Sequence, residues 1–116
     1  MIVHVVLFQP RPDLTQERRQ ELVEALNDAA TGIPAIGRCV VGRRIRHGLA
    51  GYEQSMHQDY EFAMIVELRD AAALRTYLTH PLHKAIGRHF TESAAAALAY
   101  DYETVAGTES ARLIDD

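Results

Sequence analysis

The chain has 116 residues, of which 47% are hydrophobic and 24% charged, and its formal net charge is −4. This length and composition predict one soluble globular domain without a second, and the acidic balance argues against nucleic acid as a partner. The single cysteine, Cys39, excludes an internal disulfide and a zinc site built from several thiolates. No apolar stretch approaches the roughly 18 residues of a membrane span, and the first residues lack the pattern of a secretion signal, so we expect no membrane association and a cytoplasmic protein.

The chain begins with a predicted strand and a predicted helix. Residues 2 to 9 are rich in β-branched side chains and are followed by prolines, which is typical of a strand. Both faces of this strand are apolar, so both need to be covered. Asp13 or Thr15 can cap a helix that continues to about residue 31.

Two further strands are predicted on either side of a long loop. Residues 37 to 46 predict the second strand, in which Gly42 indicates a bulge. Residues 47 to 59 are glycine-rich and polar, as in a connecting loop that borders a site. Residues 60 to 68 predict the third strand, again with two apolar faces.

Helices dominate the region after the third strand. Asp70 can cap a short helix over residues 71 to 79. A second helix begins at Pro81, because proline disfavours helical backbone in the residue before it, and we expect it to reach about residue 97. Residues 100 to 104 alternate tyrosine and threonine with acidic side chains, which predicts a fourth strand.

This element order, β-α-β-β-α-β, is typical of the ferredoxin-like α+β fold, in which helices cover one face of a four-stranded antiparallel sheet. We assign the domain to residues 1 to 105 and a polar, frayed tail to residues 106 to 116. The first and third strands are apolar on the uncovered face as well. A second copy of the chain is the simplest cover for that face, and the sequence therefore predicts a homodimer that closes an α/β barrel.

Three polar rings are expected to meet beneath the helices. Tyr77 lies on the inward side of the short helix, and His83 opens the inward stripe of the next helix, so the phenol and the imidazole can meet near the helix junction. His4 joins them if its side of the first strand faces the helices. Polar tips in apolar walls predict a small-molecule pocket. His80, which precedes a proline, is interpreted as a turn or capping residue.

Such a pocket suits proton abstraction beside a carbonyl group. A neutral imidazole, with a pKa near about 6.5, can act as the base, and a phenol, with a pKa near about 10, can donate to a developing enolate. The alternative is structural, because a buried tyrosine and histidine often bond each other or the backbone. A metal site at His80 and His83 would need His4, His89 or Asp59 as a third ligand, and none has motif spacing, so no metal is expected.

Several short motifs together resemble one known family. They are His4-Val-Val-Leu-Phe8, Leu14-Thr15, Ile33-Pro34, Val41-Gly42, Val66-Glu67-Leu68, Leu74-x-x-Tyr77-Leu78-x-His80-Pro81-x-His83 and Asp101-Tyr102. Over about residues 2 to 103 the chain is similar to the stress-responsive A/B barrel (Dabb) domain. The resemblance implies a dimeric α+β barrel of ferredoxin-like subunits, and most members of the family have no established activity.

One branch of that family, the plant olivetolic acid cyclase, implies a chemistry for the site. It is a polyketide cyclase that needs no cofactor and performs an intramolecular aldol condensation with a tyrosine and a histidine. These correspond to Tyr77 and His83, and its first-strand histidine corresponds to His4, so we expect these three as catalytic residues and no cofactor. The residues that we expect to line the ligand pocket are Val6, Phe8, Leu22, Val23, Leu26, Met64, Val66, His80 and Phe90.

The leading hypothesis is a homodimer that holds a small apolar carbonyl compound, polyketide-like or otherwise, and promotes enolate chemistry on it. The first alternative is a stress-associated or ligand-binding module without enzymatic activity. A cofactor-free monooxygenase of the same fold is less favoured by the motifs and by the absence of Trp. The bulky aromatic residues of the cyclase's first helix correspond here to Leu22, Val23 and Leu26, which leaves the identity of the substrate open.

Overall fold

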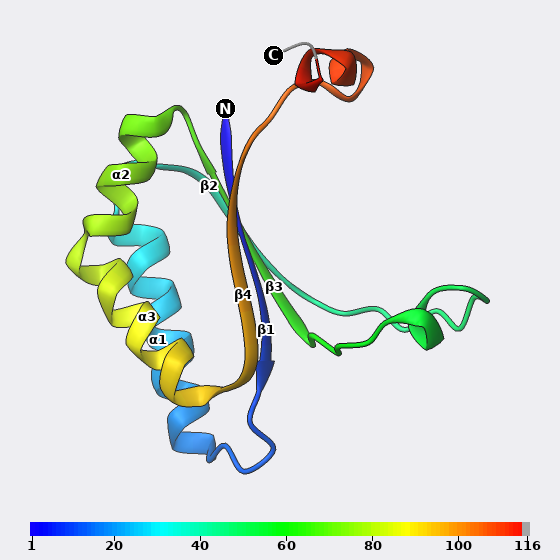
Figure 1. The fold of residues 1–116 in the computed structure, drawn as a ribbon. Helices are drawn as coiled ribbons and strands as arrows, with labels where there is room; N and C mark the ends of the chain where they lie inside the picture. Colours follow the sequence, from blue (N-terminus) through cyan, green and yellow to red (C-terminus); the bar gives the residue numbers. More distant parts are fainter. Residues whose placement is uncertain (115–116) are drawn as a thin grey trace.

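A four-stranded antiparallel sheet carries a single layer of helices in this computed structural model, which describes residues 1–114 (Figure 1). The strands are β1 (Ile2–Pro10), β2 (Ile36–Arg43), β3 (Phe62–Leu68) and β4 (Ala94–Glu103); the helices are α1 (Gln16–Gly32), α2 (Ala71–Thr79) and α3 (Pro81–Ser93); short 3-10 segments are η1 (Glu53–Ser55) and η2 (Gly107–Leu113). The strand order is β2-β3-β1-β4, with every pair antiparallel. The predicted ferredoxin-like α+β fold is confirmed.

Side-chain caps fix where each helix begins. Thr15, rather than Asp13, caps α1 by accepting a hydrogen bond from a first-turn N–H at 3.2 Å. Asp70 caps α2 in the same way at 2.9 Å. His80 caps α3 through its Nδ1, which accepts from a main-chain N–H at 3.1 Å, while Pro81 occupies the first turn. These local signals are readable in the sequence because each involves only neighbouring residues.

The end of α3 differs from the prediction. The helix stops at Ser93 instead of reaching about residue 97, and β4 begins at once with Ala94. Alanine is the best helix former, but Ala96 and Ala97 pair with Gln9 and Phe8 of β1, and the cross-strand hydrogen bonds override the local preference. The predicted fourth strand was therefore too short at its start.

The second strand is irregular at a different glycine from the one expected. Its pairing with β3 shifts register at Gly37, between Ile36 and Arg38, and stays regular through Gly42. A Cβ at Gly37 would lie 3.2 Å from the Glu67 carbonyl oxygen, whereas one at Gly42 would meet nothing within 4 Å. Close backbone approach therefore selects glycine at the irregular position.

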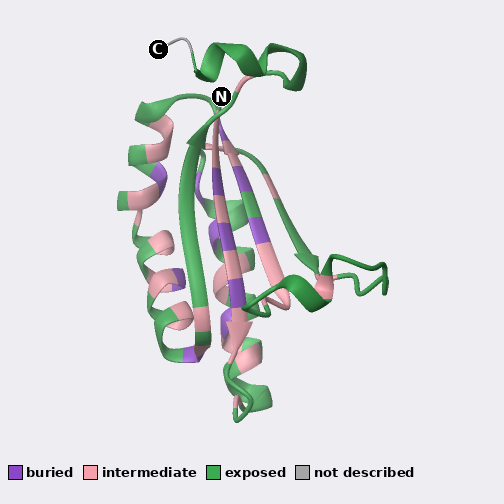
Figure 2. Cartoon of the chain, turned by 45° about the vertical axis from the view of Figure 1, so that its right-hand side comes forward, coloured by how far each residue is buried: buried purple, intermediate pink, exposed green. Residues whose placement is uncertain are grey.

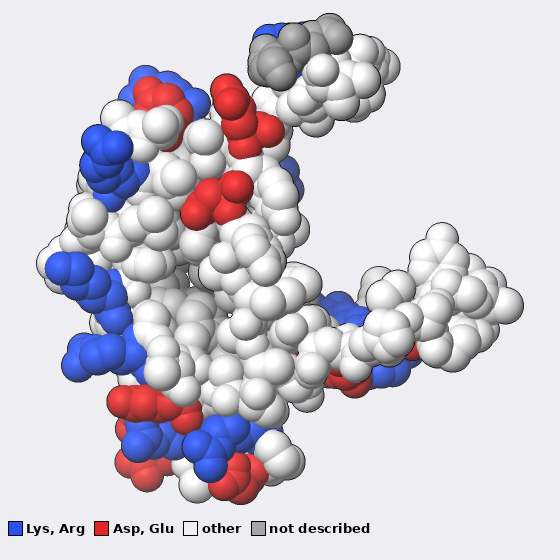
Figure 3. All heavy atoms as spheres, in the orientation of Figure 1, with Lys and Arg blue, Asp and Glu red and all other residues white. Residues whose placement is uncertain are grey.

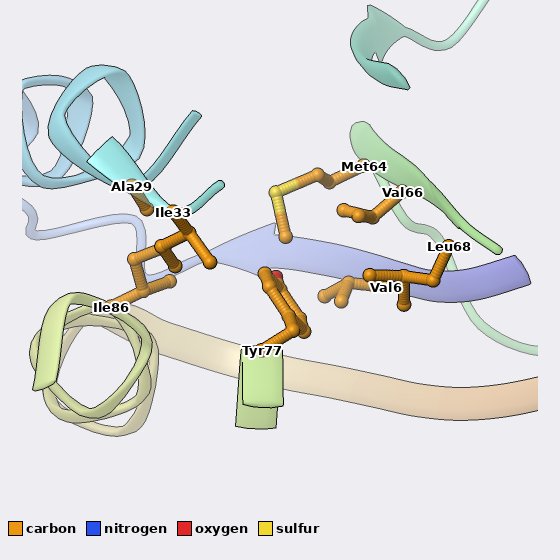
Figure 4. Close-up of a cluster of buried hydrophobic side chains, with 8 residues drawn as sticks. All are labelled: Val6, Ala29, Ile33, Met64, Val66, Leu68, Tyr77 and Ile86. Carbon is orange, nitrogen blue, oxygen red and sulfur yellow. The ribbon is translucent and has the colours of Figure 1, made fainter. Parts of the chain in front are cut away.

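The core lies between the helices and one face of the sheet. Strand residues at alternate positions point into it, and Tyr77 reaches into it from α2 (Figure 4). Its buried members are Val6, Ala29, Ile33, Met64, Val66, Leu68, Tyr77 and Ile86. Exposed residues cover much of β4 and the outer sides of the helices (Figure 2). Within the described residues, no helix has the length and apolar character needed to cross a membrane.

The loop between β2 and β3 forms an arm that projects away from the helical layer (Figure 1). Ion pairs tie its two strands together at the base: Arg46 contacts Asp59 at 3.0 Å and Glu61 at 2.8 Å, and Arg44 also pairs with Asp59. The sequence predicted a loop that borders a site, whereas this arm lies away from the helices that cover the sheet (Figure 1). In the tail, Gly107–Leu113 form η2 without a buried residue, and residues 115–116 lie outside the described part.

Candidate functional site

The three rings predicted to meet do come together beneath the helices. The ring centroids of Tyr77 and His83 are 4.7 Å apart, those of His4 and Tyr77 are 5.3 Å apart, and those of His4 and His83 are 6.0 Å apart. His4 comes from β1, Tyr77 from α2 and His83 from the first turn of α3. His4 and Tyr77 are only 4% and 1% exposed, whereas His83 is half-buried. We call these three residues the ring cluster.

The helix break explains how His83 reaches the ring cluster. His80 leaves helical geometry with ψ 139° and caps the next helix, so α3 starts in a new direction directly after α2. His83 is then only three residues beyond the cap, and its ring comes to lie against Tyr77 from the preceding helix. The role of His80 in this structure is to set that turn.

Asp101 is a fourth polar member of the site that sequence reasoning did not assign. It lies opposite His4 in the β1–β4 register, and its carboxylate accepts a hydrogen bond of 2.6 Å from His4 Nδ1. In the neutral tautomer with the proton on Nδ1, Nε2 is left as the proton acceptor. The alternation of β4 places Asp101 on the helix-facing side, but only the strand register shows that its partner is His4.

Burial decides the protonation of the two rings on the helices. Burial, followed by the negative charges of Cys39 and Asp101, raises the pKa of the Tyr77 phenol far above its ordinary value of 10.0. Burial, followed by the positive charge of a protonated His4, lowers the pKa of His83 below 6.5, opposed by a hydrogen bond to the Leu78 backbone and by Asp101. At neutral pH the site therefore holds a protonated phenol next to a neutral imidazole.

The Tyr77 hydroxyl does not contribute a hydrogen bond to the fold described by residues 1–114. Within residues 1–114 it makes no hydrogen bond to another protein group, although the residue is 1% exposed. Unlike His89 Nδ1, the Tyr77 hydroxyl oxygen is not fully buried, so a small molecule can reach it. The Tyr77 hydroxyl is thus free to donate to an oxygen atom of a bound molecule.

An apolar cavity of about 190 Å³ lies on the same face of the sheet. Seven of the residues expected to line a ligand pocket do line it: Val6, Phe8, Leu22, Val23, Leu26, Met64 and Phe90. Val66 is instead fully buried in the core, and His80 is at the helix junction. The three rings do not contribute to the lining of this cavity. The sequence suggested one pocket, and the structure places the apolar cavity and the ring cluster side by side along β1, which supplies Val6 and Phe8 to one and His4 to the other.

The candidate metal ligands do not assemble. Within the described residues no three His, Cys, Asp or Glu side chains are placed to hold a metal ion. His80 Nδ1 is occupied by its cap, and Asp59 is bound by arginines at the base of the arm. The Nδ1 of His89 is buried on α3 without a partner and shares a groove with side chains of α1, away from the ring cluster.

Comparisons with known proteins agree with this fold. The sequence matches the family described as Stress responsive A/B Barrel Domain over residues 2–104. No curated protein matches the sequence. Among solved structures, a dimeric ferredoxin-like protein of unknown function from Thermobifida fusca is similar at TM-score 0.68 and 23% identity, covering 89% of this chain and 90% of that one.

Two further structures share the fold. A Dabb family protein with a ferredoxin-like fold from Mesorhizobium loti is similar at TM-score 0.68 and 22% identity, covering 90% of this chain and 96% of that one. The hydroxynitrile lyase from Passiflora edulis is similar at TM-score 0.75 and 10% identity, covering 90% and 94%. At these identities the likeness concerns the fold alone.

Proposed function

Because this chain belongs to the stress-responsive A/B barrel (Dabb) family, as its motifs predicted, we propose that it binds a small carbonyl compound and catalyses cofactor-free enolate chemistry of the aldol or cyclase type. The observation that carries the proposal is the contact between Tyr77 and neutral His83, with the Tyr77 hydroxyl left unused by the fold. One of the proteins with this fold is described as a lyase, which is compatible with enzymatic use of the architecture.

The proposed reaction divides the work between the two rings. Tyr77 donates a hydrogen bond to the carbonyl oxygen and stabilises the charge that develops there. His83 removes a proton from the neighbouring carbon, and the C–H electron pair becomes the enolate. The enolate carbon forms a new C–C bond with a second carbonyl of the same molecule. The resulting alkoxide takes the proton back from His83, so no co-reactant is consumed.

His4 and Asp101 support that chemistry. The 2.6 Å hydrogen bond fixes the His4 ring, whose neighbours are the two reacting rings at 5.3 and 6.0 Å. A carboxylate bonded to Nδ1 fixes the tautomer and the orientation of an imidazole ring. We assign His4 as the residue that positions the rings of Tyr77 and His83.

A binding protein without catalytic activity is the second candidate. The observation that favours it is the separation of the apolar cavity from the ring cluster, since a ligand confined to that cavity would touch Val6 and Leu22 but neither Tyr77 nor His83. Such a ligand would be bound by apolar burial alone. The two candidates differ in whether the bound molecule exchanges a proton with the protein.

Deuterium exchange at carbon decides between them. The chain is incubated in D₂O with 1-phenyl-1,3-butanedione, and exchange at its acidic carbon is followed by NMR. We expect Tyr77→Phe and His83→Gln to lower the protein-dependent rate by about 10²- to 10⁴-fold. Tyr100→Phe on the other face and His57→Gln in the arm serve as matched controls that keep the rate.

The same variants test the structural alternative. Since the Tyr77 hydroxyl bonds no protein group within residues 1–114, Tyr77→Phe should leave the free energy of unfolding almost unchanged. A loss of about 1–3 kcal/mol would instead show that the hydroxyl stabilises the fold. Binding of the diketone without protein-dependent exchange would support the binding protein and contradict the enzyme.

The open face of the sheet supports a second proposal, that the chain forms a homodimer. Large apolar side chains remain exposed on it: Val40, Ile65, Leu98, Tyr100 and Tyr102. The β1 register places Tyr100 and Tyr102 beside Val5 and Val3, so the patch is continuous across strands. A patch of this kind marks an interface. The related protein from Thermobifida fusca is described as dimeric, and face-to-face packing of two such sheets would close a barrel.

A further inference from the structure

A shallow groove on α3 connects the ring cluster with solvent. His83, Gly87 and Thr91 follow one another at spacings of four residues along the helix, and all three line the groove together with Leu78. The opposite side of α3 packs on α1, so this stripe is the side turned away from the neighbouring helix. His83 thus has one side against Tyr77 and another in the groove.

The sheet leaves the same region open. Ala97 and Ala99 lie opposite Phe8 and Val6 in the strand register, which puts them on the helix-facing side of β4, yet both are exposed. Figure 3 shows a hollow between the helical layer and the strands on this side of the molecule. A Cβ built on Gly87 meets no atom within 4 Å. Small side chains on α3 and β4 therefore keep a route to the ring cluster open.

Two basic side chains occupy the rim of the groove. Lys84 and Arg88 are one turn apart on α3, and neither forms a salt bridge within residues 1–114. The acidic residue of the groove, Glu92, is held by Arg18 of α1 at 2.9 Å. Its charge is thus already compensated from outside the groove, and the two cations remain uncompensated in a chain whose net charge is −4.

We propose that Lys84 and Arg88 bind an anionic oxygen group of the ligand, a carboxylate or phosphate, while the ligand's carbonyl end passes Gly87 to reach Tyr77 and His83. This inference rests on the proposed function and adds the ligand class and the entry route. This orientation of the ligand fits the charges of the site. The inner end already holds the Asp101 carboxylate next to His4, which disfavours a second negative charge there. A ligand with its charge outward and its carbonyl inward satisfies both ends.

Three probes of matched shape, each with a ketone at one end, test the charge preference at the other end: 4-acetylbenzoate, 4-acetylphenyl phosphate and the neutral 1,4-diacetylbenzene. Their dissociation constants are measured by NMR titration on the full chain. We expect at least one anionic probe to bind roughly five- to tenfold more tightly than the neutral one, as two exposed charge contacts allow. Lys84→Gln combined with Arg88→Gln should remove that preference and leave the affinity for the neutral probe unchanged. Arg75→Gln, on α2, is the matched control and should keep it.

Substitutions at Gly87 test the proposed entry route to the ring cluster. Gly87→Leu places a side chain in the open space and should weaken all three probes at least tenfold, while the better helix propensity of leucine keeps the chain folded. Gly87→Ala gains the same kind of propensity with only a methyl group and should bind as the natural chain does. Unchanged binding in Gly87→Leu would overturn the route.

The outcomes separate this inference from the proposed function. Equal affinity for charged and neutral probes, or a preference that survives loss of both cations, overturns the anionic subsite while the carbonyl site stands. Failure of all three probes to bind the natural chain contradicts both.

Discussion

The two faces of the sheet are built from alternate residues of the same strands. The helices bury one face, and the other face remains exposed. On β3, Val66 is fully buried beneath the helices, whereas its neighbour Ile65 is 38% exposed on the other side. On β1, the covered face carries His4 among Val6 and Phe8, and the open face carries only apolar side chains and Gln9. Both faces of these two strands are thus largely apolar in sequence, but the described residues cover only one of them.

This difference shows that apolar character identifies a surface that must be buried but not the element that buries it. The helices supply one cover, and they bring Tyr77 and His83 onto His4 in doing so. Residues 1–114 provide no cover for the open face. The polar rings therefore lie on the helical side, where burial can shift pKa values, and the exposed apolar patch that we propose as the dimer interface lies on the other.

Adjacent residues on β3 give the largest expected contrast between the faces. Val66→Asp would bury a carboxylate among apolar side chains without a partner, so we expect a loss of about 4 kcal/mol or more in the free energy of unfolding. Circular dichroism and urea denaturation would show an unfolded or barely folded chain. A cooperative transition at the midpoint of the natural protein would contradict the assignment of Val66 to the core.

Ile65→Asp sharpens the comparison on the open face. A charge there should leave each subunit folded but abolish the proposed dimer, because two like charges would be forced into an apolar interface. Sedimentation should show a shift from dimer to monomer at micromolar concentration. Ala30→Asp, on the exposed side of α1, is the control and should remain dimeric. A natural chain that sediments as a monomer would refute the proposed interface.

Tyrosine titration compares the two faces by a smaller effect. The pKa of Tyr77 is raised, so its phenol should be the last of the five tyrosines to ionise in an ultraviolet titration. Tyr77→Phe should remove this late component, and Tyr100→Phe should leave it in place. Since the folded-state pKa is above the unfolded value of 10.0, the associated stability is present below pH about 10 and is lost as the pH rises further. Ionisation of every tyrosine together in the folded protein would contradict the burial argument.

His83 gives the smallest expected effect, at the opposite end of the pH range. Its folded-state pKa is lowered below 6.5, so the unfolded chain binds the proton more readily. Stability is therefore complete above pH about 6.5 and falls as the pH decreases through that value. Urea denaturation across pH 5 to 8 should show a weaker pH dependence in His83→Gln than in the natural chain. Equal slopes would show that the folded state does not shift this group.

The element order followed from the sequence because its signals are local. Asp70 as a cap, Pro81 as a helix start and the β-branched run of β1 each depend on a few adjacent residues, and the structure has all three. The contact between Tyr77 and His83 could also be predicted from the sequence, because only five residues and a single helix break lie between them. Part of the candidate site could thus be predicted without knowledge of the tertiary fold.

The features that the local signals did not predict depend on pairing between strands that are distant in sequence. The alanine run at the start of β4 is helical by propensity and became a strand because β1 lay beside it, and Asp101 met His4 only through that same register, 97 positions away in sequence. The irregularity at Gly37 likewise depends on the Glu67 carbonyl of another strand. By itself the sequence determined the order of the helices and strands and which surfaces are apolar, since these are properties of neighbouring residues. Only the tertiary structure decided strand register, the separation of the apolar cavity from the ring cluster and the open route past Gly87, because each depends on which distant backbones approach one another.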